Sequence, residues 1–258
     1  MKKNSEKQLS ESKLINLNNK VKKKNILVTG ANSRFCKFLK KSLSGKNIFF
    51  YDKKRLDITN FRKISEIIKK NRIDIFIHIA ALSRPMSIHD TDIDLSITTN
   101  IIGTANVVRA CKKQNVKLIY FSTNYVYPCT KGNYNEKHPL LPFNNYGWSK
   151  LGGECAVQMY KNSLILRLAL MSFPFLNEKA IKNAYSSYIW NKDFAKTLPK
   201  ILDETGILNV GGKRKTIYDF VKKSKRKIKS ISINKVPNFP VDSSLNVDKY
   251  NKILKINK

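Results

Sequence analysis

The sequence predicts an α/β protein built on a doubly wound parallel sheet, followed by a smaller C-terminal part. Short apolar runs alternate with segments of helical spacing, and the first run ends at Gly30. The 258 residues, of which 41% are hydrophobic, are enough to bury a full core. Strands that alternate with helices imply right-handed crossovers and therefore a parallel sheet.

The predicted strands are apolar runs typical of buried parallel strands, and they cover residues 25–29, 47–51, 73–79, 116–121 and 163–168. The predicted helices cover residues 34–43, 60–70, 96–113 and 146–160. Beyond residue 168 we expect a late strand at 207–210, a short helix at 216–223 and a basic, loop-rich stretch over 228–258. The chain then divides into a flexible basic tail (1–24), a main domain (25–170) and a small part (171–258) whose late strand returns to the main domain.

The net charge of +32 has two explanations. A basic protein can bind nucleic acid or an anionic surface. The abundance of Lys, Asn and Ile instead indicates compositional bias from AT-rich codons, and Arg, the better bidentate reader of phosphates and bases, is sparse. The lysines are also spread along the whole chain. We favour bias, and expect no specific nucleic-acid partner.

Other sequence features indicate a cytoplasmic protein without a metal site. No apolar run is long enough to cross a membrane, and the basic N-terminus lacks the apolar block of a secretory signal. The cysteines Cys36, Cys111, Cys129 and Cys155 are scattered without metal-ligand spacing. Reduced thiols in a cytoplasm are the simplest account.

The turn after the first strand is a candidate pyrophosphate site. Gly30 permits a tight turn that brings the N–H groups of the following helix to a phosphate. Ser33 and Cys36 stand where further glycines would be expected, so the motif alone fits an ordinary strand–helix turn equally well.

Asp52 ends the second predicted strand, about 20 residues after Gly30, where an acid can accept hydrogen bonds from an adenosine ribose. Alone it is as well explained as a solvated turn acid. Lys53, Lys54 and Arg55 follow and could accommodate a 2′-phosphate, so the sequence leaves NADH and NADPH both open.

Tyr146 and Lys150 are the strongest catalytic candidates. Residues four apart share a helix face, and a nearby ammonium favours the phenolate and lowers the pKa of a tyrosine. Tyr146 could then donate or accept a proton near neutral pH. The spacing is common by chance, but the pair follows the fourth strand and a loop, as an active-site helix should. Ser122 and Thr123 end that strand and could bind a substrate oxygen or merely cap a loop.

Together these features resemble the extended branch of the short-chain dehydrogenase/reductase superfamily, which has the Rossmann fold. The branch motifs occur in order: Thr29-Gly30-Ala31, Asp52, Asp57-Ile58-Thr59, His78-Ile79-Ala80-Ala81, Asn100-x-x-Gly103-Thr104, Ser122-Thr123, Tyr146-x-x-x-Lys150 and Asn209-Val210-Gly211-Gly212.

Within that branch the chain is similar to dTDP-4-dehydrorhamnose reductases at residues 56–59 (LDIT), 122–127 (STNYVY) and 240–250 (PVDSSLNVDKY). Asn124 and Tyr125 replace the Asp-Glu pair that follows the catalytic Thr of sugar-nucleotide 4,6-dehydratases, which argues against a dehydratase.

The resemblance implies an NAD(P)-dependent reductase of a nucleotide-linked 4-keto-6-deoxy sugar in surface-polysaccharide sugar synthesis. Thr123 would bind the C4 oxygen, Tyr146 would protonate it and Lys150 would hold the nicotinamide ribose. The main domain would bind the dinucleotide and the small part the substrate. The implied cofactor-binding residues are Gly30, Asn32, Ser33, Arg34, Phe35, Asp52, Asp57, Ile58, Ala80, Ala81, Leu82, Asn100, Tyr146 and Lys150.

Three points stay open in this interpretation. Because the turn lacks glycines at Ser33 and Cys36 and the C-terminal part is short, the chain could be a non-catalytic dinucleotide-binding relative that acts as a partner subunit. A nucleotide-sugar 4-epimerase is a second alternative. A homodimer is compatible with the resemblance, since dimers are common in the branch.

Overall fold

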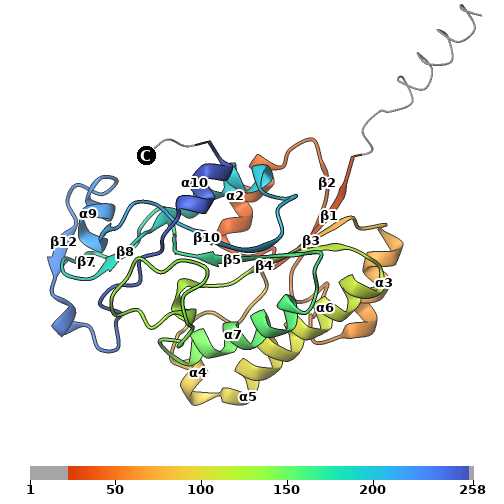
Figure 1. The fold of residues 1–258 in the computed structure, drawn as a ribbon, viewed down its shortest axis with the longest axis horizontal. Coiled ribbons are helices and arrows are strands. Elements are labelled where there is room, and N and C mark those ends of the chain that lie inside the picture. The colour runs from red at the N-terminus through yellow and green to blue at the C-terminus, as the bar shows by residue number, and fades with distance from the viewer. Residues whose placement is uncertain (1–22, 256–258) are drawn as a thin grey trace, which may run out of the picture.

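The computed structural model describes residues 23–255, whose main feature is a six-stranded parallel sheet (Figure 1). The predicted tail therefore lies outside the described residues, apart from its last two positions. The strands of this sheet are β1 (Asn25–Thr29), β2 (Asn47–Tyr51), β3 (Ile75–His78), β4 (Lys117–Phe121), β5 (Ser163–Leu168) and β10 (Gly206–Val210). The predicted doubly wound α/β fold is confirmed.

The strand order is β10-β5-β4-β3-β1-β2, so the chain leaves β1 toward one edge and returns to build the other half. In the register, Thr29 pairs with both Tyr51 and His78, which brings the carboxyl ends of β1, β2 and β3 to one level. Ligands bind in open α/β sheets at the carboxyl ends of the strands, where the strand order reverses. The fold therefore places a crevice at the ends of β1 and β3.

Helices cover both faces of the sheet. On one face lie α2 (Arg34–Ser42), α8 (Asn191–Thr197) and α10 (Asp248–Ile253), which share one apolar core with the strands. On the other face lie α3 (Phe61–Lys70), α6 (Gly103–Lys113) and α7 (Asn145–Gln158), which share a second core. Figure 1 shows α2 and α10 on one side of the strands and α3, α6 and α7 on the other.

The helix predicted over residues 96–113 is wrong as a single regular helix. Helical structure begins earlier, at α5 (Ile93–Ser96), continues as a π-helical segment (Ile97–Ile102) and becomes regular in α6. Such segments are frequent at functional sites. This one carries the buried Asn100, whereas Ile97 and Ile102 are exposed, so the apolar spacing did not mark the buried face.

The other predicted elements lie within about two residues of their observed bounds. Sequence reasoning missed α4 (Ile88–Thr91), α8 and α10. It also missed 3-10 turns at Asn124–Val126, Leu198–Lys200 and Ile233–Lys235. The stretch 228–258 contains a strand and α10, so its loop-rich assignment was incomplete. Phe194 of α8 and Tyr250 of α10 are buried in the main core, which shows that late segments return to the sheet together with β10.

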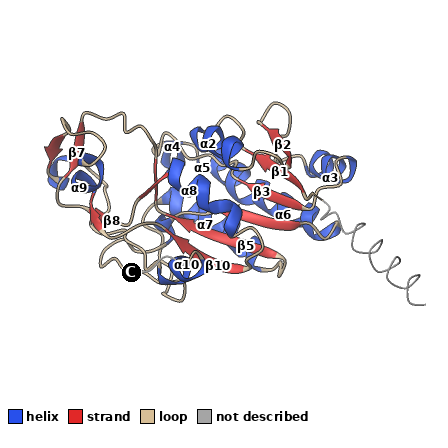
Figure 2. Cartoon of the chain, turned by 90° about the horizontal axis from the view of Figure 1, so that it is seen from above, coloured by secondary structure: helices blue, strands red, loops and turns tan. Residues whose placement is uncertain are grey.

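The remaining elements form a small lobe beyond the end of the sheet (Figures 1 and 2). There β7 (Lys179–Ile181) pairs with β12 (Lys229–Ile231), and β8 (Tyr185–Ser186) pairs with β11 (Lys215–Thr216), which leads into α9 (Ile217–Lys222). Ala180, Ile217 and Val221 belong to a separate apolar cluster in this lobe. The connection to the main sheet carries the pair β6 (Leu170–Met171) and β9 (Ile189–Trp190). The boundary after residue 170 stays a prediction.

Within residues 23–255 no helix has the length and hydropathy needed to cross a membrane. In the same range no cluster of three or more His, Cys, Asp or Glu side chains could hold a metal ion. The four cysteines are free thiols, of which Cys155 is exposed.

Candidate active site

The predicted catalytic residues meet in a cavity of about 280 Å³ at the carboxyl edge of the sheet. Its wall includes Thr123, Tyr146 and Lys150, together with Phe35 and Ala81. The cavity opens beside a cleft of about 1060 Å³ that runs between the main domain and the lobe. Both are lined by Arg84, Met86, Tyr125, Tyr146, Leu170 and Tyr188. The arrangement is a small cavity joined to a larger cleft.

The first turn of α7 is packed against the loop that follows β4. Asn144 caps α7 by accepting a hydrogen bond from the Gly147 N–H at 2.9 Å. At Gly147 a Cβ atom would lie 2.3 Å from the carbonyl oxygen of Tyr125, so the two backbones touch at a position where only glycine fits. This contact brings Tyr146 close enough for a hydrogen bond with the buried Thr123.

Burial raises the pKa of Tyr146 to about 12. The hydrogen bond from Thr123 and the charge of Arg84 oppose this shift. The sequence argument expected Lys150 to lower the pKa of Tyr146, whereas the pKa of Tyr146 is raised. Spacing along a helix does not report burial, and in this structure burial outweighs the neighbouring charges.

Lys150 lies deeper than Tyr146, with only 2% of the residue exposed. Its ammonium Nζ is 4.2 Å from the centroid of the Tyr120 ring, a cation–π arrangement. Burial lowers the pKa of Lys150 to about 7, and the charge of Glu154 opposes the shift. Lys150 therefore changes protonation near neutral pH.

The turn after β1 fits a dinucleotide pyrophosphate despite its missing glycines. Gly30 has a φ of +75°, and a Cβ there would lie 2.9 Å from the backbone nitrogen of Ala80. Ser33 caps α2 by accepting from the Cys36 N–H, and Cys36 is fully buried with Sγ 3.3 Å from the Gly30 carbonyl. The glycine that the turn needs is retained, while Ser33 and Cys36 serve the start of α2.

Asp52 and Asn32 lie side by side at the ends of β2 and β1. The Asp52 carboxylate accepts from the Arg55 N–H at 3.0 Å and from the Asn32 amide at 3.4 Å. Asp52 is half-buried, so one side of the carboxylate stays accessible to a ribose. Arg34 is exposed at the first position of α2, whereas Phe35 is buried and lines the cavity.

Two of the predicted cofactor residues after β2 are engaged within the protein. Ile58 is buried, and its side chain packs so closely on Gly103 that a Cβ atom added to the glycine would lie 2.8 Å from it. Asp57 accepts hydrogen bonds from the backbone and the hydroxyl of Thr59. Both residues belong to the segment that follows β2, and their contact with an adenine stays a prediction.

Asn100 joins the strand-end loop to the catalytic helix. Its amide oxygen accepts from the Leu82 N–H at 2.8 Å, and its amide nitrogen donates to the Leu82 carbonyl and to the Ser149 hydroxyl. The side chain is thus fully used by protein groups. Its predicted role in cofactor binding would be exerted through the position of the loop that holds Ala80, Ala81 and Leu82.

Sequence reasoning missed several residues at this site. Arg84 and Tyr188 line both cavities, and the His89 ring packs on Tyr146 at 5.2 Å between centroids. No sequence pattern pointed to His89, because α4 has only four residues. Glu154 lies four residues after Lys150 and therefore shares its helix face, so this spacing could have predicted that Glu154 lies near the site.

Comparisons with known proteins agree with this geometry. Residues 24–175 match the family described as the RmlD substrate binding domain. The structure is similar to that of dTDP-4-dehydrorhamnose reductase from Bacillus anthracis in complex with NADP, with a TM-score of 0.82, 25% identity and coverage of 92% of this chain and 94% of that one.

Two curated proteins are similar over shorter stretches. The chain is 26% identical to dTDP-4-dehydrorhamnose reductase of Aggregatibacter actinomycetemcomitans over 191 residues, which are 72% of this chain and 59% of that protein. It is 30% identical to methionine adenosyltransferase 2 subunit beta of Xenopus laevis over 117 residues, which are 45% of this chain and 35% of that protein. The matches therefore span less than two thirds of either relative.

Proposed function

Because the chain belongs to the RmlD substrate binding domain family, we propose that it is a reductase that converts a nucleotide-linked 4-keto-6-deoxy sugar to the 4-hydroxy sugar with NADH or NADPH. The observation that carries the proposal is the meeting of Thr123, Tyr146 and Lys150 at one small cavity beside a large cleft. The Bacillus anthracis neighbour, a dTDP-4-dehydrorhamnose reductase in complex with NADP, supports both the activity and the cofactor class.

The three side chains suit reduction of a ketone. With a pKa of about 12, Tyr146 keeps its proton at neutral pH and can donate it to the C4 oxygen. Thr123, already hydrogen-bonded to Tyr146, would hold the same oxygen. The nicotinamide supplies the hydride when bound. Lys150 would hold the ribose next to it, and the cleft of about 1060 Å³ would receive the rest of the sugar nucleotide.

The turn at Gly30 and the start of α2 would hold the pyrophosphate, because unpaired N–H groups at a helix N-terminus attract anions. Asp52 and Asn32 would bind the adenosine ribose. Lys53 and Lys54 are exposed beside Asp52, so a 2′-phosphate also has a cation within reach. The proposal therefore includes both cofactors.

Purified protein should oxidise NADH or NADPH when a dTDP- or UDP-linked 4-keto-6-deoxy sugar is added, followed by absorbance at 340 nm. Loss of the cofactor signal with formation of the 4-hydroxy sugar supports the reductase. Interconversion of C4 epimers without net cofactor oxidation would favour the 4-epimerase alternative. No change in any sugar nucleotide of the panel would contradict the proposal.

The second candidate function is a non-catalytic subunit that binds a dinucleotide. The similarity to a protein named as a subunit, and the replacement of two turn glycines by Ser33 and Cys36, favour it. Calorimetric binding of NADH without turnover on the panel would support this candidate over the first.

Surface-polysaccharide synthesis, a cytoplasmic location and a homodimer complete the proposal. Free thiols and the use of a nucleotide sugar with NAD(P)H support the location.

The exposed apolar side chains of Ile93, Ile97 and Trp148 line one hollow between α5 and α7 and offer a face for a second copy. A dimer in sedimentation that dissociates in Ile97→Lys supports the homodimer, and a wild-type monomer refutes it.

A further inference from the structure

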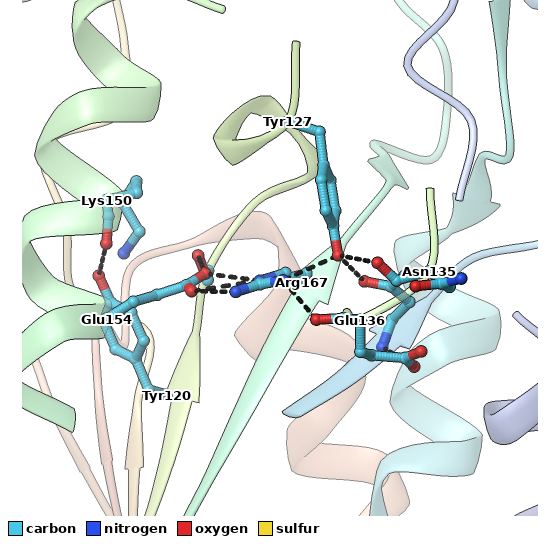
Figure 3. Close-up of polar contacts among 9 residues, drawn as sticks. Tyr120, Tyr127, Asn135, Glu136, Lys150, Glu154 and Arg167 are labelled. Carbon is cyan, nitrogen blue, oxygen red and sulfur yellow. Dashed lines mark hydrogen bonds and ion pairs between the residues drawn. The ribbon is translucent and has the colours of Figure 1, made fainter. Parts of the chain in front are cut away.

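A buried ion pair lies directly behind the catalytic residues. Glu154 on α7 is 0% exposed and Arg167 on β5 is 1% exposed. The Arg167 Nη2 donates to Glu154 Oε2 at 2.8 Å, and Nε lies 3.2 Å from both carboxylate oxygens (Figure 3). Removing two charges from water costs several kcal/mol per ion before their attraction offsets it. A stability role alone is therefore a weak explanation for this pair.

Glu154 contacts the end of β4 and acts on Lys150 through its charge. Its Oε1 accepts a short hydrogen bond from the hydroxyl of Ser122, the residue before Thr123. On α7, Glu154 lies one turn after Lys150, and its charge favours the protonated form of that lysine. One carboxylate therefore hydrogen-bonds the end of β4 and lies on the same helix as the buried ammonium, one turn away.

Arg167 is itself held in place. Its Nη1 donates to the Tyr127 hydroxyl at 2.8 Å, and that hydroxyl donates to the Asn135 carbonyl at 2.9 Å (Figure 3). Tyr127 also hydrogen-bonds Asn209 of β10 at 3.1 Å. The guanidinium therefore cannot swing away, and it fixes the direction of the Glu154 carboxylate.

The other ionisable groups around Lys150 supply no opposing negative charge. Tyr120 presents its ring from β4, and burial raises its pKa well above the usual value, so it stays neutral. His78 on β3 and His89 on α4 have pKa values lowered by burial, to about 3 for His78, and both stay uncharged near pH 7. Tyr146 stays protonated. Among the described residues, the negative charge of Glu154 acts on Lys150 and raises its pKa.

We propose that Glu154, oriented by Arg167, is a positioning residue that supplies the counter-charge for Lys150 and fixes the Ser122–Thr123 end of β4. The relevance to catalysis rests on the proposed reductase function, because that function gives Lys150 and Thr123 their roles. The electrostatic part of the proposal concerns the protein alone, without cofactor or substrate.

The direct test is the titration of Lys150 by NMR of lysine side chains labelled at Cε, with the resonance assigned by its loss in Lys150→Arg. In Glu154→Gln the midpoint should fall by about one pH unit or more, since an opposite charge one helical turn away is lost. An unchanged midpoint in a folded Glu154→Gln protein would overturn the proposal. Asp242→Asn is a matched control, because Asp242 forms the buried end of another arginine pair, with Arg214. Its Lys150 midpoint should equal that of the wild type.

Glu154→Gln leaves Arg167 buried without its partner and could prevent folding, since breaking such a pair costs about 3–5 kcal/mol. The double variant Glu154→Gln/Arg167→Met leaves no buried guanidinium without its partner, and its Lys150 midpoint should fall as well. A folded double variant with the wild-type midpoint would refute the counter-charge. Because the titration needs no cofactor, its outcome is independent of the reductase assay. Either experiment can fail while the other succeeds.

Ser122→Ala separates the second part of the proposal. It removes the hydrogen bond to Glu154 and leaves the ion pair in place. We expect kcat to fall about 10-fold with an unchanged Lys150 midpoint, because misplacement of a catalytic group by a fraction of an ångström is costly. Wild-type kcat in Ser122→Ala would contradict the positioning of Thr123 through Glu154.

Discussion

Gly147 packs so closely on Tyr125 that a Cβ atom added to the glycine would lie 2.3 Å from the Tyr125 carbonyl oxygen. This contact sets the distance between the loop after β4 and the first turn of α7. The loop carries Thr123 and the turn carries Tyr146. This backbone contact therefore sets how the two side chains meet at the small cavity.

Replacement of this glycine is the first prediction. Gly147→Ala should force α7 away from the loop, destabilise the protein by about 1–3 kcal/mol and lower kcat more than it lowers NADH affinity. Urea unfolding, calorimetry and steady-state kinetics measure the three effects. Met159→Ala, at the 87% exposed end of the same helix, should leave all three near wild-type values. A Gly147→Ala protein with full kcat would contradict the inferred contact.

The second prediction compares two of the glycines that have a positive φ, Gly30 and Gly45. Gly30 has a φ of +75° and touches Ala80, whereas Gly45 has a φ of +81° and nothing within 4 Å of an added Cβ. Alanine at either position strains the backbone. Only Gly30→Ala should weaken NADH binding, by about 10-fold or more, since it alone displaces the strand ends around the pyrophosphate. Equal NADH affinity in the two variants would argue against this cofactor site.

The third prediction concerns the proton donor. Tyr146→Phe keeps the ring that packs on His89 and removes the hydroxyl. General acid catalysis contributes about 10²–10⁴-fold, so kcat should fall by that factor while NADH still binds. Thermal unfolding checks that the variant is folded. Retention of wild-type kcat would remove Tyr146 from the mechanism.

The pH dependence of activity is the fourth prediction. In the proposed mechanism Lys150 holds the ribose as an ammonium, and the pKa of Lys150 is about 7, so kcat/KM should fall as pH rises through about 7. Tyr146, with a pKa of about 12, keeps its proton over that range and should not contribute a limb below pH 9. An activity that rises between pH 6 and 9 would contradict this assignment.

Acid destabilisation is the fifth prediction. Burial lowers the pKa of His78 to about 3, so the unfolded chain binds the proton more tightly than the folded protein does. His78 therefore contributes stability that is complete above its unfolded pKa of about 6.5 and is lost as pH falls toward 3. Urea unfolding between pH 7 and 4 should show this loss, and a smaller one in His78→Gln. Identical slopes in the two proteins would exclude His78 as a cause.

The main sheet was predictable because its strands are continuous apolar runs, such as residues 25–29 and 163–168, separated by long amphipathic helices. The meeting of Thr123, Tyr146 and Lys150 at one cavity was predictable because these residues keep their order relative to the strands. Neither prediction required knowledge of a distant contact. Helices α8 and α10 were missed because they are short, and they bury single large side chains, Phe194 and Tyr250, against the sheet.

Properties that depend on burial could not be predicted from the sequence. The effect expected of Lys150 on Tyr146 assumed solvent-like surroundings, and the structure places both groups where burial controls the pKa. The Glu154–Arg167 pair joins helix α7 to strand β5, and nothing in the sequence pairs the two residues. The hydrogen bonds of Asn100 depend on a π-helical segment that no apolar period indicates.

Hydride transfer itself tests the central claim most directly. The protein is incubated with a nucleotide-linked 4-keto-6-deoxy sugar and with NADH or NADPH deuterated on the transferred position, and the product is analysed by mass spectrometry and NMR. The account predicts a 4-hydroxy sugar that carries deuterium at C4, with little or none formed by Tyr146→Phe. A recovered sugar without deuterium at C4, from a wild-type protein that binds the cofactor, would contradict it.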